Sequence, residues 1–294
     1  MMTEANFIDV DGIKTRYFDK GDGPVLLLVH GSHMGTPDAC ESALDWEFNF
    51  AVLAQRFRVI AMDKLGQGFT DNPKADTDYT MAATVSHAAG LLRALGLNNV
   101  HVIGHSRGGY VVARLTLDHP DLVRSCIIVD SGTLAPGPSK TEYLMANAPK
   151  PRLSRASQRW CMERYSFRSH HISQTWLDAA EEIGKSAKYQ ETVRKMEDEG
   201  LKRKQFFTHL AVHKEETLNW IIQGKLIQPT LLIWGYNDPT ALLKRGHALF
   251  EIIADGNPRS ELHVINEAGH FCYREQPETF NQVVAGFVER CAKL

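Results

Sequence analysis

The chain has 294 residues, of which 43% are hydrophobic and 23% charged, the balance of a soluble globular protein. Its formal net charge of −2 gives no sign of a surface for nucleic acid or an anionic membrane. No apolar run approaches the roughly 20 residues of a membrane span, and the N-terminal stretch lacks the pattern of a secretory signal. We expect a cytoplasmic protein with neither nucleic acid nor membrane as a partner.

The cysteines are odd in number and lack the C-x-x-C spacing of a zinc site or a redox pair. We therefore expect buried or partly buried thiols, with no metal bound and none acting as a nucleophile. They are Cys40, Cys126, Cys161, Cys272 and Cys291.

Short apolar runs that end in Gly, Asp or Ser alternate with helical patterns up to about residue 134. Continuous apolar runs are typical of parallel strands covered on both faces. The alternation predicts a doubly wound parallel sheet, with functional loops at the carboxyl ends of its strands. The predicted strands are 24–31, 57–63, 100–106 and 124–132, and the predicted helices are about 79–95 and 108–118.

The strand pattern then stops and later returns. Residues 133–157 hold four prolines and no strand signal, and residues 158–224 have helical patterns rich in charge and aromatics. Strands are predicted again at 229–239 and 261–270, before a closing helix at about 277–292. We predict one α/β core, residues 1–134 and 226–294, interrupted by a helical lid, residues 135–225.

The stretch Gly104–Gly108 fits the pattern G-x-S-x-G, between a predicted strand and a predicted helix. Glycines on either side allow a tight turn that holds the serine in strained geometry with its hydroxyl exposed. The helix N-terminus behind it adds a positive dipole end. The pattern predicts Ser106 as a nucleophile.

A serine nucleophile needs a base, and the base needs an acid to orient it. Among 13 histidines, His270 stands out because it follows the last predicted strand. Asp238 follows the strand before it, which gives the order Ser, Asp, His expected at such a turn. Asp130, at the end of an earlier strand, is the rival acid, and we prefer Asp238.

An oxyanion formed at Ser106 requires two backbone donors. We expect one from the N–H of Arg107 and the other from the N–H of Ser32, with Gly31 permitting the turn. The segment "GQG" at 66–68 lacks the strand-to-helix context of a dinucleotide fingerprint, so we predict no cofactor.

Together these motifs resemble the α/β-hydrolase superfamily over essentially the whole chain. They are "HGS" at 30–32, "DKLGQGFTD" at 63–71, "GHSRGG" at 104–109, "GYNDP" at 235–239 and "AGH" at 268–270. Within the superfamily the chain is most similar to the meta-cleavage product hydrolases of aromatic degradation. The supporting segments are the "HGS" loop, "WEFNFAVLAQRFRVIAMDKLGQGFTDNP" and "VDSGTLAPG".

The resemblance implies a mostly parallel sheet flanked by helices, a helical lid, and a homodimer or larger assembly. It also implies a small-molecule substrate, a 2-hydroxy-6-oxo-hexa-2,4-dienoate whose carbon–carbon bond is hydrolysed after His-assisted tautomerisation to the keto form. Asn49 matches an asparagine that binds the dienoate end in that family. The other expected substrate contacts are Gly31, His105, Phe271 and, in the lid, Trp160.

Three departures from the family pattern leave the substrate open. His105 stands where those enzymes have Asn, Phe271 stands where they have Trp, and residues 172–183 lack the lid arginine that binds the substrate carboxylate. The alternatives are hydrolysis of an ester or lactone, and a ligand receptor of the same fold with slow or no turnover. Residues able to replace the missing arginine are Arg107, Arg159, Arg164, Arg168 and His171.

Overall fold

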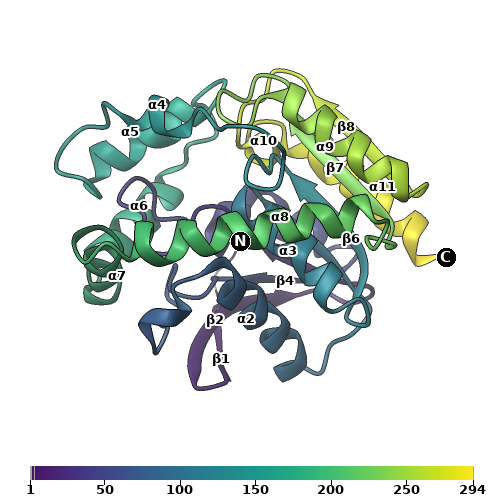
Figure 1. Cartoon of the computed structure of the whole chain (residues 1–294), viewed down its shortest axis with the longest axis horizontal. Helices are drawn as coiled ribbons and strands as arrows, with labels where there is room; N and C mark the ends of the chain where they lie inside the picture. Colours follow the sequence, from purple (N-terminus) through teal and green to yellow (C-terminus); the bar gives the residue numbers. More distant parts are fainter. Residues whose placement is uncertain (1, 3, 294) are drawn as a thin grey trace.

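A mostly parallel β-sheet forms the centre of the molecule in the computed structural model, which describes residues 2 and 4–293 (Figure 1). Eight strands of the described chain follow the order β1-β2-β4-β3-β5-β6-β7-β8. The pairs β1–β2 and β2–β4 are antiparallel, and all other pairs are parallel. The strands are β1 (Asn6–Val10), β2 (Ile13–Lys20), β3 (Val25–Val29), β4 (Arg58–Met62), β5 (Val100–His105), β6 (Val123–Val129), β7 (Thr230–Gly235) and β8 (Ser260–Ile265).

The predicted fold class is confirmed, and each of the predicted strands is present, with β6 and β8 beginning one residue earlier than expected. The antiparallel strands β1 and β2 were not predicted, because exposed and buried residues are mixed in them without a continuous apolar run. All five cysteines are buried and free. Within the described residues, no helix has the length and apolar character needed to cross a membrane.

Alternating side chains of the central strands divide the core into two layers. On β3, Leu27 and Val29 face the helices α2 and α3, and Leu26 and Leu28 face α1 and α11. Burial on both faces explains why the strand sequences are continuously apolar. The flanking helices are α1 (Glu47–Leu53), α2 (Met81–Ala94), α3 (Arg107–Asp118), α9 (Leu243–Gly256) and α11 (Pro277–Ala292), of which α1 and α9 were not predicted.

The segment between β6 and β7 is helical, as predicted, and its helices pack in two ways. Helices α5 and α6 pack against each other, while α8 lies across α2 and α3 and contacts α9 (Figure 1, green). Serine side chains that accept hydrogen bonds from backbone N–H groups cap α5, α6 and α7 at their start. The helices are α4 (Thr141–Met145), α5 (Arg155–Tyr165), α6 (Gln174–Lys185), α7 (Ala187–Val193) and α8 (Thr208–Ile222).

The turn between β5 and α3 is packed so closely that it admits no side chains at its glycines. A Cβ atom on Gly104 would lie 2.1 Å from the carbonyl oxygen of Gly108. A Cβ atom on Gly108 would lie 2.3 Å from the carbonyl oxygen of Val29. The two glycines therefore allow the first turn of α3 to rest directly on the backbone of β3 and β5.

We predict that Gly108→Ala lowers the free energy of unfolding by about 1–3 kcal/mol, because backbone must move to admit the methyl group. Gly286→Ala in α11 is the control, since the nearest atom to its added Cβ is Arg290 Nη1 at 3.6 Å. The control is expected to be neutral or stabilising by about 0.5–1 kcal/mol, because alanine favours helix. Urea unfolding of both variants checks this, and equal effects would contradict it.

Candidate active site

Ser106 lies at the junction of β5 and α3 with φ 53° and ψ −115°, a conformation that residues with a side chain rarely adopt. Its N–H donates to Val129 O at 2.8 Å, and its carbonyl oxygen accepts from Ser131 Oγ at 2.6 Å. Both neighbours belong to β6 or to the loop that follows it. Hydrogen bonds from the adjacent strand thus hold the strained residue, whose side chain stays partly exposed.

His270 and Asp238 meet in a short hydrogen bond. His270 Nδ1 lies 2.6 Å from Asp238 Oδ2, with both side chains buried. The other carboxylate oxygen, Oδ1, accepts from the N–H groups of Thr240 and Ala241 and from Thr240 Oγ1, at 2.7 to 2.9 Å. The carboxylate that orients the imidazole is therefore itself fixed by the start of the loop after β7.

Burial and charge act in opposite directions on this pair. Burial lowers the pKa of His270, but the adjacent Asp238 carboxylate outweighs it and raises the pKa to about 9. Burial also raises the pKa of Asp238, and the neighbouring His270 outweighs that effect, so the net shift is downward. The pair therefore favours an ionised aspartate against a readily protonated imidazole.

Asp130, the alternative acid, forms its hydrogen bond with β7 and not with His270. Its Oδ1 accepts from Gly235 N at 2.8 Å, and no hydrogen bond joins it to His270 in the described chain. Burial, followed by the charge of Asp238, raises its pKa well above the usual range. Burial thus shifts Asp130 toward its uncharged form, its side chain bridges β6 and β7, and Asp238 is the residue paired with His270.

Ser106, Asp238 and His270 all follow the carboxyl ends of strands, and the structure gathers them at one edge of the sheet. The ring of His105, next to Ser106, lies 4.7 Å from the ring of His270. Among the described residues, no hydrogen bond within 3.5 Å is formed between Ser106 Oγ and His270.

The loop after β3 presents a free backbone donor beside this edge. Ser32 has φ 62°, and its carbonyl oxygen accepts from Lys64 Nζ at 2.8 Å. His30 Nδ1 donates to Gly31 O at 3.0 Å. In the part of the chain that the structure describes, the N–H groups of Ser32 and Arg107 have no hydrogen-bond acceptor, so both remain available to a ligand.

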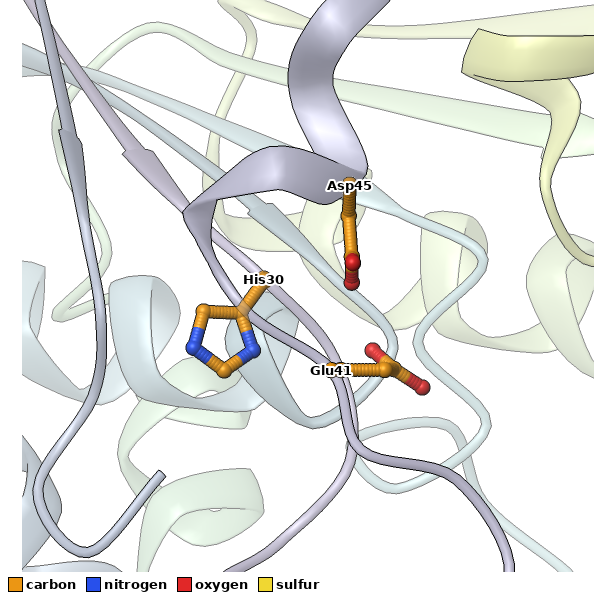
Figure 2. Close-up of side chains that lie close together, drawn as sticks. All are labelled: His30, Glu41 and Asp45. Atoms are coloured by element: carbon orange, nitrogen blue, oxygen red, sulfur yellow. The ribbon is translucent and has the colours of Figure 1, made fainter. Parts of the chain in front are cut away.

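A buried acid pair lies behind this loop. The side chains of His30, Glu41 and Asp45 point toward one another (Figure 2), with ligand atoms within 4.8 Å of each other. Burial raises the pKa of Glu41, and burial together with the charge of Glu41 raises that of Asp45 well above its usual range. Burial lowers the pKa of nearby Lys64 to about 7, although Glu41 opposes this. Burial therefore shifts the pKa of each of the three groups toward its uncharged form.

The same cluster is a poor fit for a metal ion. His30 Nε2 accepts from Lys64 N at 3.1 Å, and Nδ1 is already used by Gly31 O, so neither nitrogen is free to coordinate. Asp45 Oδ1 accepts from Trp176 Nε1 at 2.7 Å. Ligation would break these bonds, and burial raises the pKa of both carboxyls, which opposes the ionised form that a metal ligand requires.

His105, a predicted substrate contact, is wholly buried and supports His270. Its Nε2 donates to the carbonyl oxygen of His270 at 2.8 Å, and its Nδ1 lies 4.0 Å from Glu41 Oε2. Burial lowers the pKa of His105 well below its ordinary value, which keeps the ring neutral. Gly31 is close to both groups, since a Cβ there would lie 2.3 Å from Glu41 Oε2 and 2.8 Å from His105 Nδ1.

The other predicted substrate contacts, Phe271, Trp160 and Asn49, differ in burial and in location. Phe271 is buried against the rings of His105, Tyr165 and Trp176, between the core and the inserted helices. Trp160 is half-buried on α5. Asn49 is outside the site.

The amide nitrogen of Asn49 is fully used in the core. Its Nδ2 donates to Tyr273 O and to Asn281 Oδ1, each at 2.9 Å. The side chain is completely buried. We therefore describe Asn49 as a link between α1, α10 (Cys272–Glu275) and α11, and leave it out of the site.

The residues predicted as able to bind a substrate carboxylate differ in solvent exposure and in whether they already have a partner. Arg159 and Arg168 are exposed and pair with Glu163 and Glu267. Arg164 is also exposed, with its guanidinium over the ring of Trp160.

His171 is buried, and its Nε2 lies 2.7 Å from Ser166 Oγ. Burial lowers its pKa to about 3, so it carries no charge to offer. The remaining candidate, Arg107, is next to Ser106.

A carboxylate not anticipated from the sequence joins the inserted segment to the loop of His270. Glu275 Oε2 accepts from the N–H groups of Phe167 and Arg168, at 2.9 and 3.0 Å, and Oε1 accepts from Gly269 N at 2.8 Å. His270 N donates to Tyr165 O at 2.9 Å. We call these contacts the Glu275 joint. No local sequence signal points to it, because two of the three backbone groups that Glu275 binds, those of Phe167 and Arg168, are 108 and 107 residues away.

Known hydrolases are similar to this chain in sequence and in fold. A 2-hydroxymuconate semialdehyde hydrolase from Pseudomonas sp. (strain CF600) is 27% identical over 283 residues, 94% of this chain and 91% of that protein. The structure of a meta-cleavage product hydrolase from Pseudomonas fluorescens IP01 superposes with a TM-score of 0.78 at 23% identity, covering 97% of each chain.

The structure of the 2-hydroxy-6-oxo-6-phenylhexa-2,4-dienoate hydrolase from Rhodococcus sp. strain RHA1 gives a TM-score of 0.75 at 19% identity, covering 97% of this chain and 100% of that one. At these identities the two solved structures establish the fold. The expected resemblance is confirmed by the family model described as alpha/beta hydrolase fold, which matches residues 24–277. With the strand order, the turn at Ser106 and this match in agreement, the chain belongs to the α/β-hydrolase family.

Proposed function

We propose that the protein hydrolyses a carbon–carbon bond in ring-fission products of the 2-hydroxy-6-oxo-hexa-2,4-dienoate type. The observation that carries the chemistry is the 2.6 Å hydrogen bond between His270 and Asp238, at the same sheet edge as the strained Ser106. The substrate class rests on the nearly full-length similarity to a 2-hydroxymuconate semialdehyde hydrolase.

In this proposal Asp238 holds His270 in one orientation, with Nδ1 bound and Nε2 free for proton transfer. His270 first assists conversion of the dienol to its keto form. Then Ser106, or a water molecule activated by His270, attacks the distal carbonyl group, which is a ketone in most such compounds and an aldehyde in 2-hydroxymuconate semialdehyde. Addition of one water across the bond gives a hydroxydienoate and a carboxylic acid.

Negative charge develops on the carbonyl oxygen during attack, and backbone N–H groups without an acceptor can stabilise it by hydrogen bonds. The N–H groups of Ser32 and Arg107 are assigned as the oxyanion hole. Removing one such donor typically costs about 2.7–4 kcal/mol of transition-state stabilisation. Lys64 supports this arrangement by its 2.8 Å bond to the carbonyl oxygen of Ser32.

Residues 135–225 are proposed as the lid of the site and residues 1–134 and 226–294 as the core. The Glu275 joint fixes the lid at residues 165–168, next to His270. Phe271 provides an apolar wall between the two parts. A lid that excludes water strengthens the charge interactions inside.

Hydrolysis of a small hydrophobic ester or lactone is the second candidate. His105 and Phe271 depart from the expected family pattern, and the inserted segment offers no buried, unpaired arginine among its described residues. The same three catalytic side chains serve ester cleavage, so the two candidates differ in product and not in machinery.

We predict that Ser106→Ala abolishes or stalls bleaching of the yellow dienolate formed by 2-hydroxymuconate semialdehyde. Loss of a triad member typically lowers kcat by about 10⁴ to 10⁶. Stopped-flow absorbance of native and variant protein measures this, beside p-nitrophenyl esters. Cleavage of the esters without any bleaching would replace the carbon–carbon reaction by esterase activity, and turnover of neither panel would contradict both.

We predict that kcat/KM falls with decreasing pH below about 9, because His270 has its pKa raised to about 9 and acts only when unprotonated. In Asp238→Asn the anion that raises this pKa is gone, so the acid midpoint moves toward the ordinary value of about 6.5 while the rate drops.

Asp130→Asn is the matched control, since burial raises the pKa of Asp130 and an amide oxygen still accepts from Gly235 N. Asp130 raises the pKa of His270 less than Asp238 does, so the midpoint is expected to move less than in Asp238→Asn. A midpoint that moves in Asp130→Asn and not in Asp238→Asn would reverse the assignment of the acid.

We predict that Glu275→Gln loosens the lid, because one amide oxygen cannot serve three backbone donors that two carboxylate oxygens now serve. Each buried donor left without a partner costs about 1–3 kcal/mol. Hydrogen exchange should accelerate at the amides of Phe167, Arg168 and Gly269. Glu251→Gln, an exposed change of the same kind on α9, should leave these amides protected.

A further inference from the structure

Arg107 carries a guanidinium without a partner beside the candidate nucleophile. We propose that this guanidinium binds a carboxylate of the substrate, so that the protein is selective for acid-bearing acyl compounds. The inference deepens the proposed function and rests on the site at Ser106, but it holds for either scissile bond.

The first support is the lack of any acceptor for this side chain. Arg107 Nε is buried and has no hydrogen-bond partner. Among the described residues, no carboxylate lies within 4.0 Å of its guanidinium. A buried donor left unpaired is costly, and a cation costs more than a neutral group.

Each of the four buried arginines has at least one carboxylate or carbonyl partner for its guanidinium, although Arg16, Arg245 and Arg274 also keep a buried nitrogen without a hydrogen bond. The partly exposed Arg107 has no such partner among the described residues. Arg16 pairs with Asp63 at 2.8 Å, and Arg114 binds Asp118 at 2.9 Å. Arg245 donates to carbonyl oxygens of the loop after β6. Arg274 donates to the carbonyl oxygens of Asp45 and His171 and pairs with Glu47.

The second support is the shortage of negative charge around Arg107. Burial raises the pKa of Glu41 and Asp45, which favours their uncharged acids. Burial and the charge of Arg107 together lower the pKa of His33 well below its usual value. Arg107 also lowers the pKa of Lys64. A positive site without a resident counter-ion favours an anionic ligand.

The third support is position. Arg107 is the first residue of α3, and its backbone N–H is a proposed oxyanion donor. Its side chain is partly exposed, as is that of Ser106. A guanidinium can bind both oxygens of a carboxylate in one plane, which fixes orientation as well as distance. Anchoring the acid end there would place a carbonyl of the same molecule over Ser106.

Two esters that differ only in charge test this proposal. Mono-p-nitrophenyl glutarate carries a terminal carboxylate, and p-nitrophenyl valerate has a methyl group in its place. The native protein should prefer the glutarate. Arg107→Met should raise KM for the glutarate by about tenfold or more, as loss of a charge-assisted pair implies. Any change in kcat/KM that arises from the oxyanion hole applies to both esters, so the loss for the glutarate should exceed the loss for the valerate by about tenfold. Arg107→Lys should recover part of the loss.

Arg93→Met is the matched control, because Arg93 is an exposed arginine at the end of α2 whose loss changes the net charge equally. It should leave the preference intact. Calorimetry with glutarate and dimethyl glutarate in a Ser106→Ala background gives a measurement that needs no turnover. There, binding of the diacid should depend on Arg107.

An equal loss of kcat/KM on both esters in Arg107→Met would overturn the proposal. Equal affinity of Ser106→Ala for glutarate and dimethyl glutarate would overturn it as well, and either result would leave Arg107 a structural role. The dienolate assay separates this result from the proposed function. If dienolates are not cleaved but the native protein prefers the charged ester through Arg107, carbon–carbon hydrolysis fails and the carboxylate site stands.

Discussion

The site depends on one backbone constraint, the left-handed conformation of Ser106 between β5 and α3. Such strain costs on the order of 1–3 kcal/mol and persists only where the surroundings over-determine it. Here the surroundings are the bonds to Val129 and Ser131 and the close contact of α3 with β3 that Gly108 permits. The same contact sets the direction of α3, and with it the positions of the Arg107 N–H and guanidinium. Nucleophile, oxyanion donor and proposed anchor are thus consequences of one turn.

Equal burial does not give equal charge in this protein. Asp130 and Asp238 are both fully buried a strand apart, yet the pKa of Asp130 rises and that of Asp238 falls. The difference is the imidazole of His270, which contacts only Asp238 by a hydrogen bond. Glu41 shows the intermediate case, since it is buried near several cations and its pKa is still raised. The charge of His270 and the hydrogen bonds to Asp238 together therefore outweigh the burial of Asp238, whereas the cations near Glu41 do not outweigh the burial of Glu41.

The sequence was sufficient for features encoded locally. Continuous apolar runs identified the parallel strands, and the chain order Ser106, Asp238, His270 selected side chains that the sheet then gathered at one edge. The sequence was insufficient where a residue's role depends on distant partners. Asn49 was assigned to substrate from a motif, but it bonds to Tyr273 and Asn281 across the core. Glu41, Asp45 and Glu275 had no signal, because only folding brings their partners near.

The carboxylate of Glu275 binds the inserted segment through the main-chain N–H groups of Phe167 and Arg168, while its carbonyl oxygen accepts from His170 Nε2. Such recognition is blind to the identity of residues 167 and 168. Any residue but proline at these two positions can donate the same hydrogen bonds, so substitutions there are expected to preserve the attachment beside His270. The indole of Trp176, which donates to Asp45 Oδ1 at 2.7 Å, anchors the same segment through a side chain. In evolutionary terms the first attachment tolerates substitution of its residues and the second restricts it.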